Sequence, residues 1–510
     1  MLSLVNADLN VIDERTVFMI DLTIHKEGLE QNIKKARENR IVLPTFEQMM
    51  YPGANVPEQT AEKLKNVGMW ELSPLNLFRI SWKNEQIPKG GLFGKPNYIE
   101  LPSELTGVSA KIVCLVGKFF PTGCHKVGAS FGCLVPRLVT GQFNSATQKA
   151  VWPSTGNYCR GGAFNSKLLA CESVAILPEG MSRERFEWLS QIADEIIATP
   201  GSESNVKEIF DKTNELRNTR DDVMIFNQFE EMGNYLWHYK VTGNAVSEVF
   251  SDIDSNSRDK LNFAGICLMS GSAGSLGAGD YLKQVFPYSK IAVGEALQCP
   301  TILNNGFGDH RIEGVGDKHI PWIHNVRNTD MAIAIDDADA MKLLRLFNEP
   351  AGIEFLTDEI GMNPVDAQNL SLMGISGIAN MLCAIKFAKH YELTYKDVVA
   401  TVLTDCSLMY GSRVEELREA EGVYSGSKAS VDFTGSLLET GTDNMLELTH
   451  SERRRVHNLK YYTWVEQQGK TAEELEALWY HQDTTFEAVQ KQAEKIDELI
   501  KEFNDAVGIA

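Results

Sequence analysis

Between about residue 66 and residue 410, short β-branched runs alternate with stretches of helical pattern, and this alternation limits the fold more than any other feature of the chain. Runs of roughly four to eight apolar residues bounded by turn residues predict strands, whereas apolar residues that recur three and four apart predict helices. Strands that are separated by a helix pair in parallel, because the chain crosses back over the sheet between them. The sequence therefore predicts an α/β fold built from parallel βαβ units.

The individual segments are short but distinct. The predicted strands are IVCLVGKF, KAVWPST, ESVAILP, VMIFNQF, FAGICLMS, KIAVGEAL and VVATVLTD. The predicted helices include ERFEWLSQIADEII, AGDYLKQVF and IANMLCAIKFAKHY. Loops are expected at ATPGSESN and IPKGGLFGKPN.

The two ends of the chain differ from its centre. Residues 1–65 and residues 411–510 are charged and mostly helical in pattern. Capping boxes are expected where Thr471 precedes Glu474 and where Thr484 precedes Glu487. One apolar stripe runs along the last helix and consists of Phe486, Val489, Ala493, Ile496, Ile500 and Phe503. Such a stripe fits either docking on the chain's own body or a contact between subunits.

Charge and cysteine content argue against several classes of function. The 510 residues carry a formal net charge of −20, which disfavours nucleic acid or an anionic membrane surface as a partner. The nine cysteines are scattered and form no CxxC pair, which favours a reduced, cytoplasmic compartment over a disulfide framework. No signal peptide is expected at the first residues, and no window of about 18 apolar residues predicts a membrane span.

Three clusters of small residues each follow a predicted strand. They are PTGCHKVGAS at 121–130, PSTGNYCRGGAF at 153–164 and SGSAGSLGAGD at 270–280. Open parallel sheets bind ligands beyond the carboxyl ends of their strands. We therefore expect the three clusters to line one crevice.

Each cluster offers a different chemistry. Lys126 in the first cluster is an amine at a strand-to-helix turn, where desolvation makes a lysine nucleophilic, although a surface lysine is the simpler interpretation. The second cluster offers hydroxyl, amide and backbone donors to a carboxylate, or forms a plain polar turn. The third cluster has the form of an anion cradle at a helix N-terminus, or of a close-packed turn.

The ordered set of motifs resembles the fold type II family of pyridoxal-phosphate enzymes, which includes cysteine synthase, cystathionine β-synthase and the tryptophan synthase β-subunit. The resemblance covers roughly residues 66–410. The segments that carry it, in family order, are WELSPLNLFRI, TGCHKVGAS, STGN, ILPEGMSRERFEWL, FNQF, HYKVTGNAVSEV, GSAGSLGAGDYLKQVFP, HRIEGVGDKHIPWI and GISGIANMLCAIKFA.

The resemblance implies an architecture and an assembly. Two parallel-sheet α/β lobes would hold pyridoxal 5'-phosphate in the crevice between them, with the smaller lobe at roughly residues 120–235. Residues 1–65 and 411–510 would be helical extensions of the catalytic core at 66–410. The family also implies a homodimer with a small amino-acid substrate.

The same resemblance implies roles for residues of this chain. Lys126 would form the internal aldimine and act as the base at the substrate Cα. His125 would be either a phosphate contact or a core histidine, Asn157 would hold the ring hydroxyl, and Ser376 would face the pyridine nitrogen. The cofactor phosphate would be held by Gly271, Ser272, Ala273, Gly274 and Ser275. The substrate carboxylate would be faced by Ser154, Thr155, Gly156, Asn157 and Gln228.

The implied reaction is β-elimination or β-replacement on a β-substituted amino acid of the serine, O-acetylserine or cysteine type, through an aminoacrylate intermediate. The chain departs from the family at three places: Phe119-Phe120-Pro121 before the lysine, Val127-Gly128 after it, and Arg160, where the family has a small or apolar residue. No counterpart of the tryptophan synthase glutamate is found in STGNYC. Tryptophan synthesis is therefore disfavoured.

Three other functions compete with this interpretation. The GxSxG pattern around Ser130 is that of a serine hydrolase, but the serine would lie inside the helix and not at the turn. The glycines after residue 270, with Glu295 at the end of the next strand about twenty residues on, imitate the dinucleotide fingerprint of an NAD-dependent oxidoreductase. A non-catalytic subunit with a degenerate site is the third alternative.

A metal site is not expected. Histidines and aspartates do gather between residues 309 and 324, but their spacing matches no standard zinc pattern. The residues concerned are Asp309, His310, Asp317, His319 and His324.

Overall fold

The computed structural model describes residues 18–85, 91–154, 156–201, 206–316 and 318–509. Within them the strands form two sheets. The larger sheet has the order β1-β2-β10-β7-β8-β9-β11, and the smaller has the order β5-β4-β3-β6. Their bounds are β1 Tyr98–Leu101, β2 Lys111–Val116, β3 Lys149–Pro153, β4 Ser173–Pro178, β5 Glu195–Thr199, β6 Val223–Ile225, β7 Asn262–Met269, β8 Lys290–Ala296, β9 Met331–Ile335, β10 Asp397–Leu403 and β11 Met445–Glu447.

Parallel pairing dominates both sheets. In the larger sheet β2, β10, β7, β8 and β9 run parallel, while β1 and β11 add to the two edges in antiparallel orientation. In the smaller sheet each strand runs parallel to its neighbour. The buried strands are apolar on both faces, as sheets covered on both sides require. The predicted α/β fold with two parallel sheets is confirmed.

Each of the seven predicted strands is present, but the segment after β4 was predicted wrongly. It was expected to be one helix through residues DEII, whereas α8 ends at Ile192 and Glu195–Thr199 form β5. Pairing with β4 decides the conformation of this segment, because a strand beside a buried parallel strand gains hydrogen bonds that a helix extension would forgo. The edge strands β1 and β11 and the buried strand β9 were not anticipated either.

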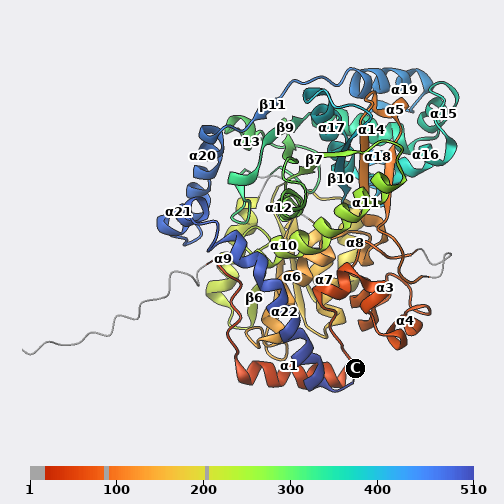
Figure 1. The fold of residues 1–510 in the computed structure, drawn as a ribbon. Helices are drawn as coiled ribbons and strands as arrows, with labels where there is room; N and C mark the ends of the chain where they lie inside the picture. Colours follow the sequence, from red (N-terminus) through yellow and green to blue (C-terminus); the bar gives the residue numbers. More distant parts are fainter. Residues whose placement is uncertain (1–17, 86–90, 155, 202–205, 317, 510) are drawn as a thin grey trace, which may run out of the picture.

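Helices cover both sheets, with the smaller sheet in the lower half of Figure 1 and the larger sheet in the upper half. In the centre of the chain the helices are α5 Ser103–Thr106, α6 Lys126–Val139, α7 Asn157–Leu168, α8 Arg183–Ile192, α9 Val206–Thr219, α10 Met232–Trp237, α11 Gly243–Asn256, α12 Leu276–Val285, α13 Thr301–Asn304, α14 Asp337–Asn348, α15 Pro350–Asp358, α16 Pro364–Asn369 and α17 Ile375–His390. The short 3-10 turns are η2 Pro74–Arg79, η4 Gly117–Phe119, η5 Pro121–Gly123, η7 Val326–Asn328, η8 Leu370–Leu372 and η9 Ser407–Met409, and the π-helical turns are η6 His238–Thr242, η10 Thr434–Leu438 and η11 Tyr461–Val465.

The two terminal segments meet where the last helix, α22, packs on α1, α2 and α6 on the smaller-sheet side, whereas α19 of the C-terminal segment packs on α14 and α15 in the upper half of Figure 1. Their helices are α1 Lys26–Glu38, α2 Phe46–Met50, α3 Pro52–Asn55, α4 Glu58–Leu64, α18 Gly411–Glu421, α19 Gly426–Phe433, α20 His450–Asn458, α21 Ala472–Tyr480 and α22 Phe486–Val507. The apolar stripe of α22 is buried against α1, α2, α6 and α10. Of the two alternatives for this stripe, docking on the chain's own body is the one observed.

The two predicted capping boxes have different outcomes. Thr471 and Glu474 form the reciprocal pair of hydrogen bonds at the start of α21. The box at Thr484 is wrong, because α22 begins only at Phe486. The hydroxyl of Thr485 donates instead to the His481 carbonyl at 2.7 Å, which closes the turn between the two helices.

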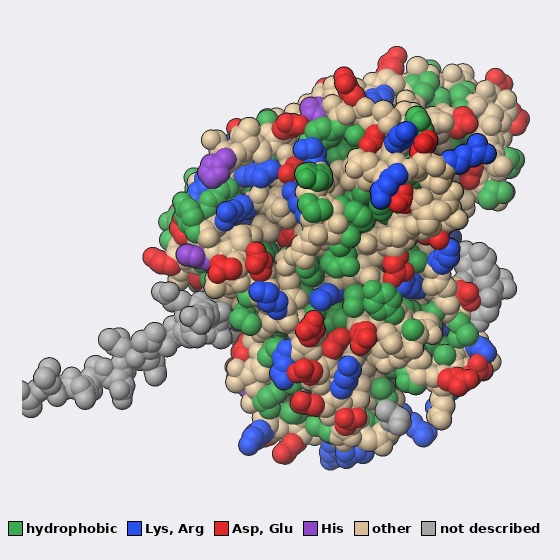
Figure 2. Space-filling view, viewed as in Figure 1, with side chains coloured by type: hydrophobic (Ala, Val, Ile, Leu, Met, Phe, Trp, Pro, Cys, Tyr) green, Lys and Arg blue, Asp and Glu red, His purple; other side chains and the backbone are tan. Residues whose placement is uncertain are grey.

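Acidic and basic side chains are interspersed on the face of the molecule in Figure 2, without a large field of either sign. In the described part of the chain no single helix is long and apolar enough to cross a membrane. By length and composition one bent pair would pass, formed by Pro364–Leu372 and Ile375–His390 at an angle of 116°.

Candidate active site

Lys126 is the first residue of α6, which follows β2 through the two tight turns η4 and η5. The chain reverses there in the left-handed region, at Thr122 with φ 70° and at Gly123 with φ 67°. A threonine at positive φ is strained, so the surrounding contacts must hold it in place. Gly123 also has no room for a side chain, since a Cβ would lie 2.9 Å from the ring of Trp70.

The loop between β7 and α12 forms a concave cradle of backbone donors. None of the N–H groups of residues 271–275 donates to an acceptor within the described residues. Ala273 lies in the left-handed region with φ 64°. A Cβ on Gly271 would lie 2.5 Å from the Gly314 carbonyl, so the loop packs tightly against the backbone at Gly314. Free N–H groups at the start of a ten-residue helix suit an anion such as a phosphate.

Hydrogen bonds join the lysine to this cradle and to the small-residue cluster after β3. Lys126 Nζ donates to Ser272 Oγ at 2.9 Å and to Gln228 Oε1 at 3.3 Å. Gln228 Nε2 donates in turn to Ser154 Oγ at 3.3 Å. Residues separated by up to 146 positions in the sequence thus meet where β2, β3, β6 and β7 end.

Asn234 on α10 supports the cradle from behind and was missed by the sequence analysis. Its amide nitrogen donates to the Gln228 carbonyl at 2.9 Å and to Ser272 Oγ at 3.1 Å. Its amide oxygen occupies the place that a Cβ on Gly274 would need. No local pattern marks this asparagine, because its partners are on other elements.

Asn157, the first residue of α7, lies in a buried polar network. Its amide nitrogen donates to Asp405 Oδ2 at 2.7 Å, and Arg160 Nη1 approaches its amide oxygen at 3.4 Å. The Tyr410 hydroxyl donates to the same Asp405 oxygen at 2.8 Å. Burial, followed by the neighbouring Asp405 carboxylate, raises the pKa of Tyr410, so this phenol stays protonated.

A second group of charges links the two sheets. Arg185 on α8 forms an ion pair with Glu313 and lies 3.8 Å from Asp405, beneath the Tyr410 ring. Glu313 also accepts a hydrogen bond from Arg413 Nε at 2.6 Å. The Arg185 side chain fills the space beside Gly156, which has φ 143°. Sequence reasoning did not identify these partners.

His125 and Ser376 lie apart from the hydrogen-bonded group around Lys126. The His125 ring stacks on Trp82 at 5.6 Å and meets His238 edge-on at 5.0 Å, and burial lowers its pKa to about 3. Ser376 is buried in the first turn of α17, whose preceding residue Gly374 packs against Asp405. No side-chain hydrogen bond within the described residues joins either one to Lys126. Thr155 lies outside the described residues.

The serine-hydrolase and dinucleotide-binding interpretations find no support in the geometry. Ser130 is inside α6 and its hydroxyl donates back to the Lys126 and Val127 carbonyls, so it is not at the apex of a turn. The Glu295 carboxylate accepts hydrogen bonds from the backbone of Ile302 and Leu303 at 2.8 Å and is therefore occupied.

Two of the three histidines between residues 309 and 324 are engaged in hydrogen bonds. His310 Nε2 pairs with the Gly316 carbonyl at 2.8 Å, and His324 Nε2 pairs with Thr329 at 2.9 Å. The described residues contain no group of three or more histidine, cysteine, aspartate or glutamate side chains that could hold a metal ion, and Asp317 lies outside them.

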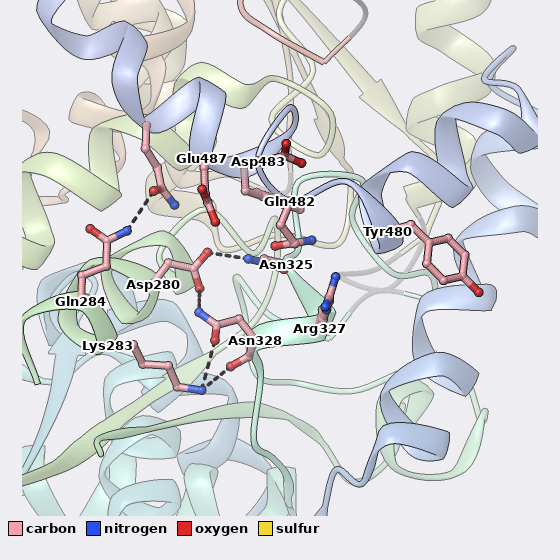
Figure 3. A pocket seen from close by; sticks show the side chains of 12 residues that line it. Asp280, Lys283, Gln284, Asn325, Arg327, Asn328, Tyr480, Gln482, Asp483 and Glu487 are labelled. Carbon is pink, nitrogen blue, oxygen red and sulfur yellow. Dashed lines mark hydrogen bonds between the residues drawn. The ribbon is translucent and has the colours of Figure 1, made fainter. Parts of the chain in front are cut away.

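A basin of about 580 Å3 lies elsewhere, between α12, η7 and the segment that joins α21 to α22 (Figure 3). Its deepest carboxylate, Asp280, accepts hydrogen bonds from Tyr235, Asn325 and Asn328. Lys283 Nζ likewise donates hydrogen bonds to the backbone carbonyl and the side-chain oxygen of Asn328. These hydrogen bonds join α10, α12 and η7 to one another, while Gln284 and Arg327 reach the C-terminal segment at Gln490 and at the Trp479 carbonyl.

The residues around Lys126 fit pyridoxal phosphate. The cradle at 271–275 supplies free backbone donors for a phosphate, and a lysine amine lies beside it, hydrogen-bonded to Ser272. The Asn157 amide keeps one N–H beyond the one used by Asp405, which can serve a ring oxygen.

The chain is similar in sequence to known enzymes. No protein-family model matches the chain. A cysteine synthase of Staphylococcus aureus is 30% identical over 254 residues, which cover 50% of this chain and 72% of that enzyme. Cysteine synthase B of Campylobacter jejuni is 27% identical over 292 residues, covering 57% and 86%. The cystathionine beta-synthase of Saccharomyces cerevisiae is 22% identical over 390 residues, covering 74% and 72%.

Solved structures share the fold. The cysteine synthase of Entamoeba histolytica matches with a TM-score of 0.54 at 19% identity, covering 67% of this chain and 93% of that one. The O-acetylserine dependent cystathionine beta-synthase of Helicobacter pylori matches with a TM-score of 0.52 at 22% identity, covering 62% and 95%. These likenesses confirm the fold class that the motifs predicted.

Proposed function

The chain belongs to the cysteine synthase family of fold type II enzymes, and from that premise we propose that it is a pyridoxal-phosphate-dependent enzyme acting on a β-substituted amino acid such as serine, O-acetylserine or cysteine. The reaction is β-elimination or β-replacement at that amino acid. The observation that carries the proposal is the hydrogen-bonded group of Lys126, Gln228, Ser154 and Ser272 beside a cradle of free backbone donors.

Residues 271–275 would hold the cofactor's phosphate through their N–H groups, and Asn157 its ring oxygen. Ser376, at the start of α17, is proposed to face the ring nitrogen. When bound, the cofactor supplies an electron sink that stabilises negative charge at the substrate Cα. Lys126 is the group that moves the Cα proton, because its amine lies beside the cradle, with oxygen acceptors at 2.9 Å and 3.3 Å.

The substrate carboxylate is proposed to bind at the start of α7. Ser154 supplies a hydroxyl, Thr155 and Gly156 are proposed to face the carboxylate, and Gln228 supplies an amide that already reaches Ser154. This arrangement orients an α-amino acid with its Cα toward Lys126.

The test is to purify the protein with pyridoxal phosphate and incubate it with serine, O-acetylserine and cysteine, each with and without sulfide. Release of keto acid, or formation of cysteine, is the readout. Lys126→Ala should lower turnover by several orders of magnitude, since one residue both binds the cofactor and moves the proton. Lys118→Ala, on the same connection, is the matched control. Full activity of Lys126→Ala would refute the assignment.

We further propose a cytoplasmic homodimer, as the family resemblance implies. The nine cysteines are unbridged and buried, which supports a reduced compartment. The α22 stripe is used within the chain, so a dimer contact would involve another face. Light scattering coupled to size-exclusion chromatography measures the mass directly, and a monomer mass at micromolar concentration would contradict the dimer.

A further inference from the structure

Arg160 is a buried cation at a position where the family has a small or apolar residue. Its side chain is 0% exposed, and no carboxylate forms an ion pair with it within the described residues. The guanidinium lies on the Trp188 ring at 4.8 Å and donates to the Thr122 carbonyl at 3.0 Å and toward Asn157 Oδ1 at 3.4 Å. Burying a charge costs free energy, so the hydrogen bonds and the ring contact of this guanidinium must offset that cost and hold the contacted groups in place.

Asp405 lies on the opposite side of the Asn157 amide. The carboxylate is 0% exposed and its Oδ2 accepts from Asn157 Nδ2 at 2.7 Å. Asn157 therefore lies between a cation at its oxygen and an anion at its nitrogen. In the reversed orientation, the amide NH2 would face the guanidinium donors and the amide oxygen would face the carboxylate. Both contacts would then be repulsive, so the two charges select one orientation.

The same guanidinium ties this amide to the loop that carries Lys126. Thr122 precedes that lysine in the turn η5 and has φ 70°, a conformation that needs external support. Arg160 donates to its carbonyl, so one side chain contacts both the lysine loop and Asn157. The spacing between the two loops therefore depends on Arg160.

We propose that Arg160 and Asp405 are positioning residues that turn the Asn157 amide nitrogen toward the ring oxygen of the cofactor. This inference rests on the proposed function, in which Asn157 contacts that oxygen. A donor held at a phenolate oxygen favours the ionised ring, and the two charges keep that donor in place. Without them the amide can rotate and present its oxygen, which an anionic ring oxygen repels.

The experiment is to compare absorption spectra and cofactor dissociation constants of Arg160→Met with those of the wild-type holoenzyme. Lysine-bound pyridoxal phosphate with an ionised ring oxygen absorbs at about 410–430 nm, and the un-ionised form absorbs at about 330 nm. Arg160→Met should transfer absorbance from the first band to the second and weaken cofactor binding about tenfold. Arg160→Lys, which keeps a cation, should recover part of the first band.

Two further comparisons separate positioning from a structural role. In an Asn157→Ala background, Arg160→Met should change the band ratio no further, because it acts through that amide. Arg345→Met also removes a buried guanidinium, which lies on α14 and pairs with Glu349 just after that helix, and it should lower the urea midpoint while leaving the bands unchanged.

An unchanged band ratio in Arg160→Met would overturn this inference and leave the proposed function standing. The same shift on adding Arg160→Met to Asn157→Ala would do so too. Asp405→Asn provides a second variant that keeps the shape of the site, and it should shift the bands in the same direction by a smaller amount. A band ratio equal to wild type in Asp405→Asn would overturn the positioning role of Asp405. A wild-type protein without a band at about 410–430 nm would overturn the proposed function and this inference together.

Discussion

Gly274 packs against Asn234 so closely that a methyl group has no place between them. The cradle depends on this contact, because Asn234 also donates to Ser272, the partner of Lys126. At the scale of single residues, the cradle therefore requires glycine at position 274 as well as the Asn234 and Ser272 side chains. The same holds at Gly374, where Asp405 takes up the space of a Cβ.

Gly274→Ala should therefore push the cradle away from α10 and weaken binding of pyridoxal phosphate at least about tenfold, since overpacking a tight contact typically costs about 1–3 kcal/mol. Equilibrium titration of the apoprotein with the cofactor measures this change. Gly426→Ala on α19 is the matched control, because a Cβ there meets no atom within 4 Å. Equal affinities in the two variants would show that the cradle does not hold the cofactor.

Among the elements, α22 joins the two ends of the chain. Its buried stripe packs on α1 and α6, and the backbone N–H of Phe46, the first residue of α2, donates to the Asp497 carboxylate at 2.6 Å. Arg37 on α1 donates to the Ala506 carbonyl at 2.6 Å. The helix therefore acts as a strap over the smaller-sheet side of the molecule, close to α6, whose first residue is Lys126 (Figure 1).

Ile500→Ala should destabilise the protein by about 2–5 kcal/mol, because it opens a cavity under a fully buried side chain. Ile509→Ala, just past the end of α22 and 38% exposed, should change stability by less than about 0.5 kcal/mol. Urea denaturation of both variants measures the difference. If Ile500→Ala changed the oligomeric mass and left the urea midpoint unaltered, the stripe would be an interface between subunits and not an internal contact.

For the whole molecule, a buried lysine couples stability to pH. Lys460 is 0% exposed and donates to the carbonyls of Trp322 and His324 at 2.8 Å, which anchors the C-terminal segment to the core. Burial lowers the pKa of Lys460 to about 7. An unfolded lysine keeps its proton up to about pH 10.4, so between about pH 7 and that value the unfolded chain binds more protons. The contribution of this residue to stability therefore rises with pH across that window and is smallest below it.

Lys460→Met should remove this dependence. The free energy of unfolding of the wild type should rise relative to the variant by up to about 1.4 kcal/mol per pH unit between about pH 7.5 and about pH 9.5. Lys491→Met, an exposed change on α22, should run parallel to the wild type. Urea midpoints at several pH values give the slopes, and parallel slopes for wild type and Lys460→Met would show that the buried amine keeps its proton.

Local patterns in the sequence were sufficient for the architecture and for the kinds of residue at the site. Strand-helix alternation predicted the parallel sheets, and small residues after strands predicted where Lys126 and the cradle would lie, because both depend on neighbours within a few positions. The same reasoning failed at Glu195–Thr199, where pairing with β4 outweighs helical continuation. It could not find Asn234 either, since that side chain matters only through contacts with other elements.

The sequence by itself determined the α/β class, the amine at the end of β2 and the donor-rich loop before α12, because spacing and side-chain size decide these over short distances. The tertiary structure alone decided the order of the strands, the docking of α22 and the partners of Asn157. Asp405 meets that asparagine across 248 positions of sequence, and nothing short of the folded chain sets such a distance. Contacts between buried charges depend on how whole elements pack, and packing is a property of the fold as a whole.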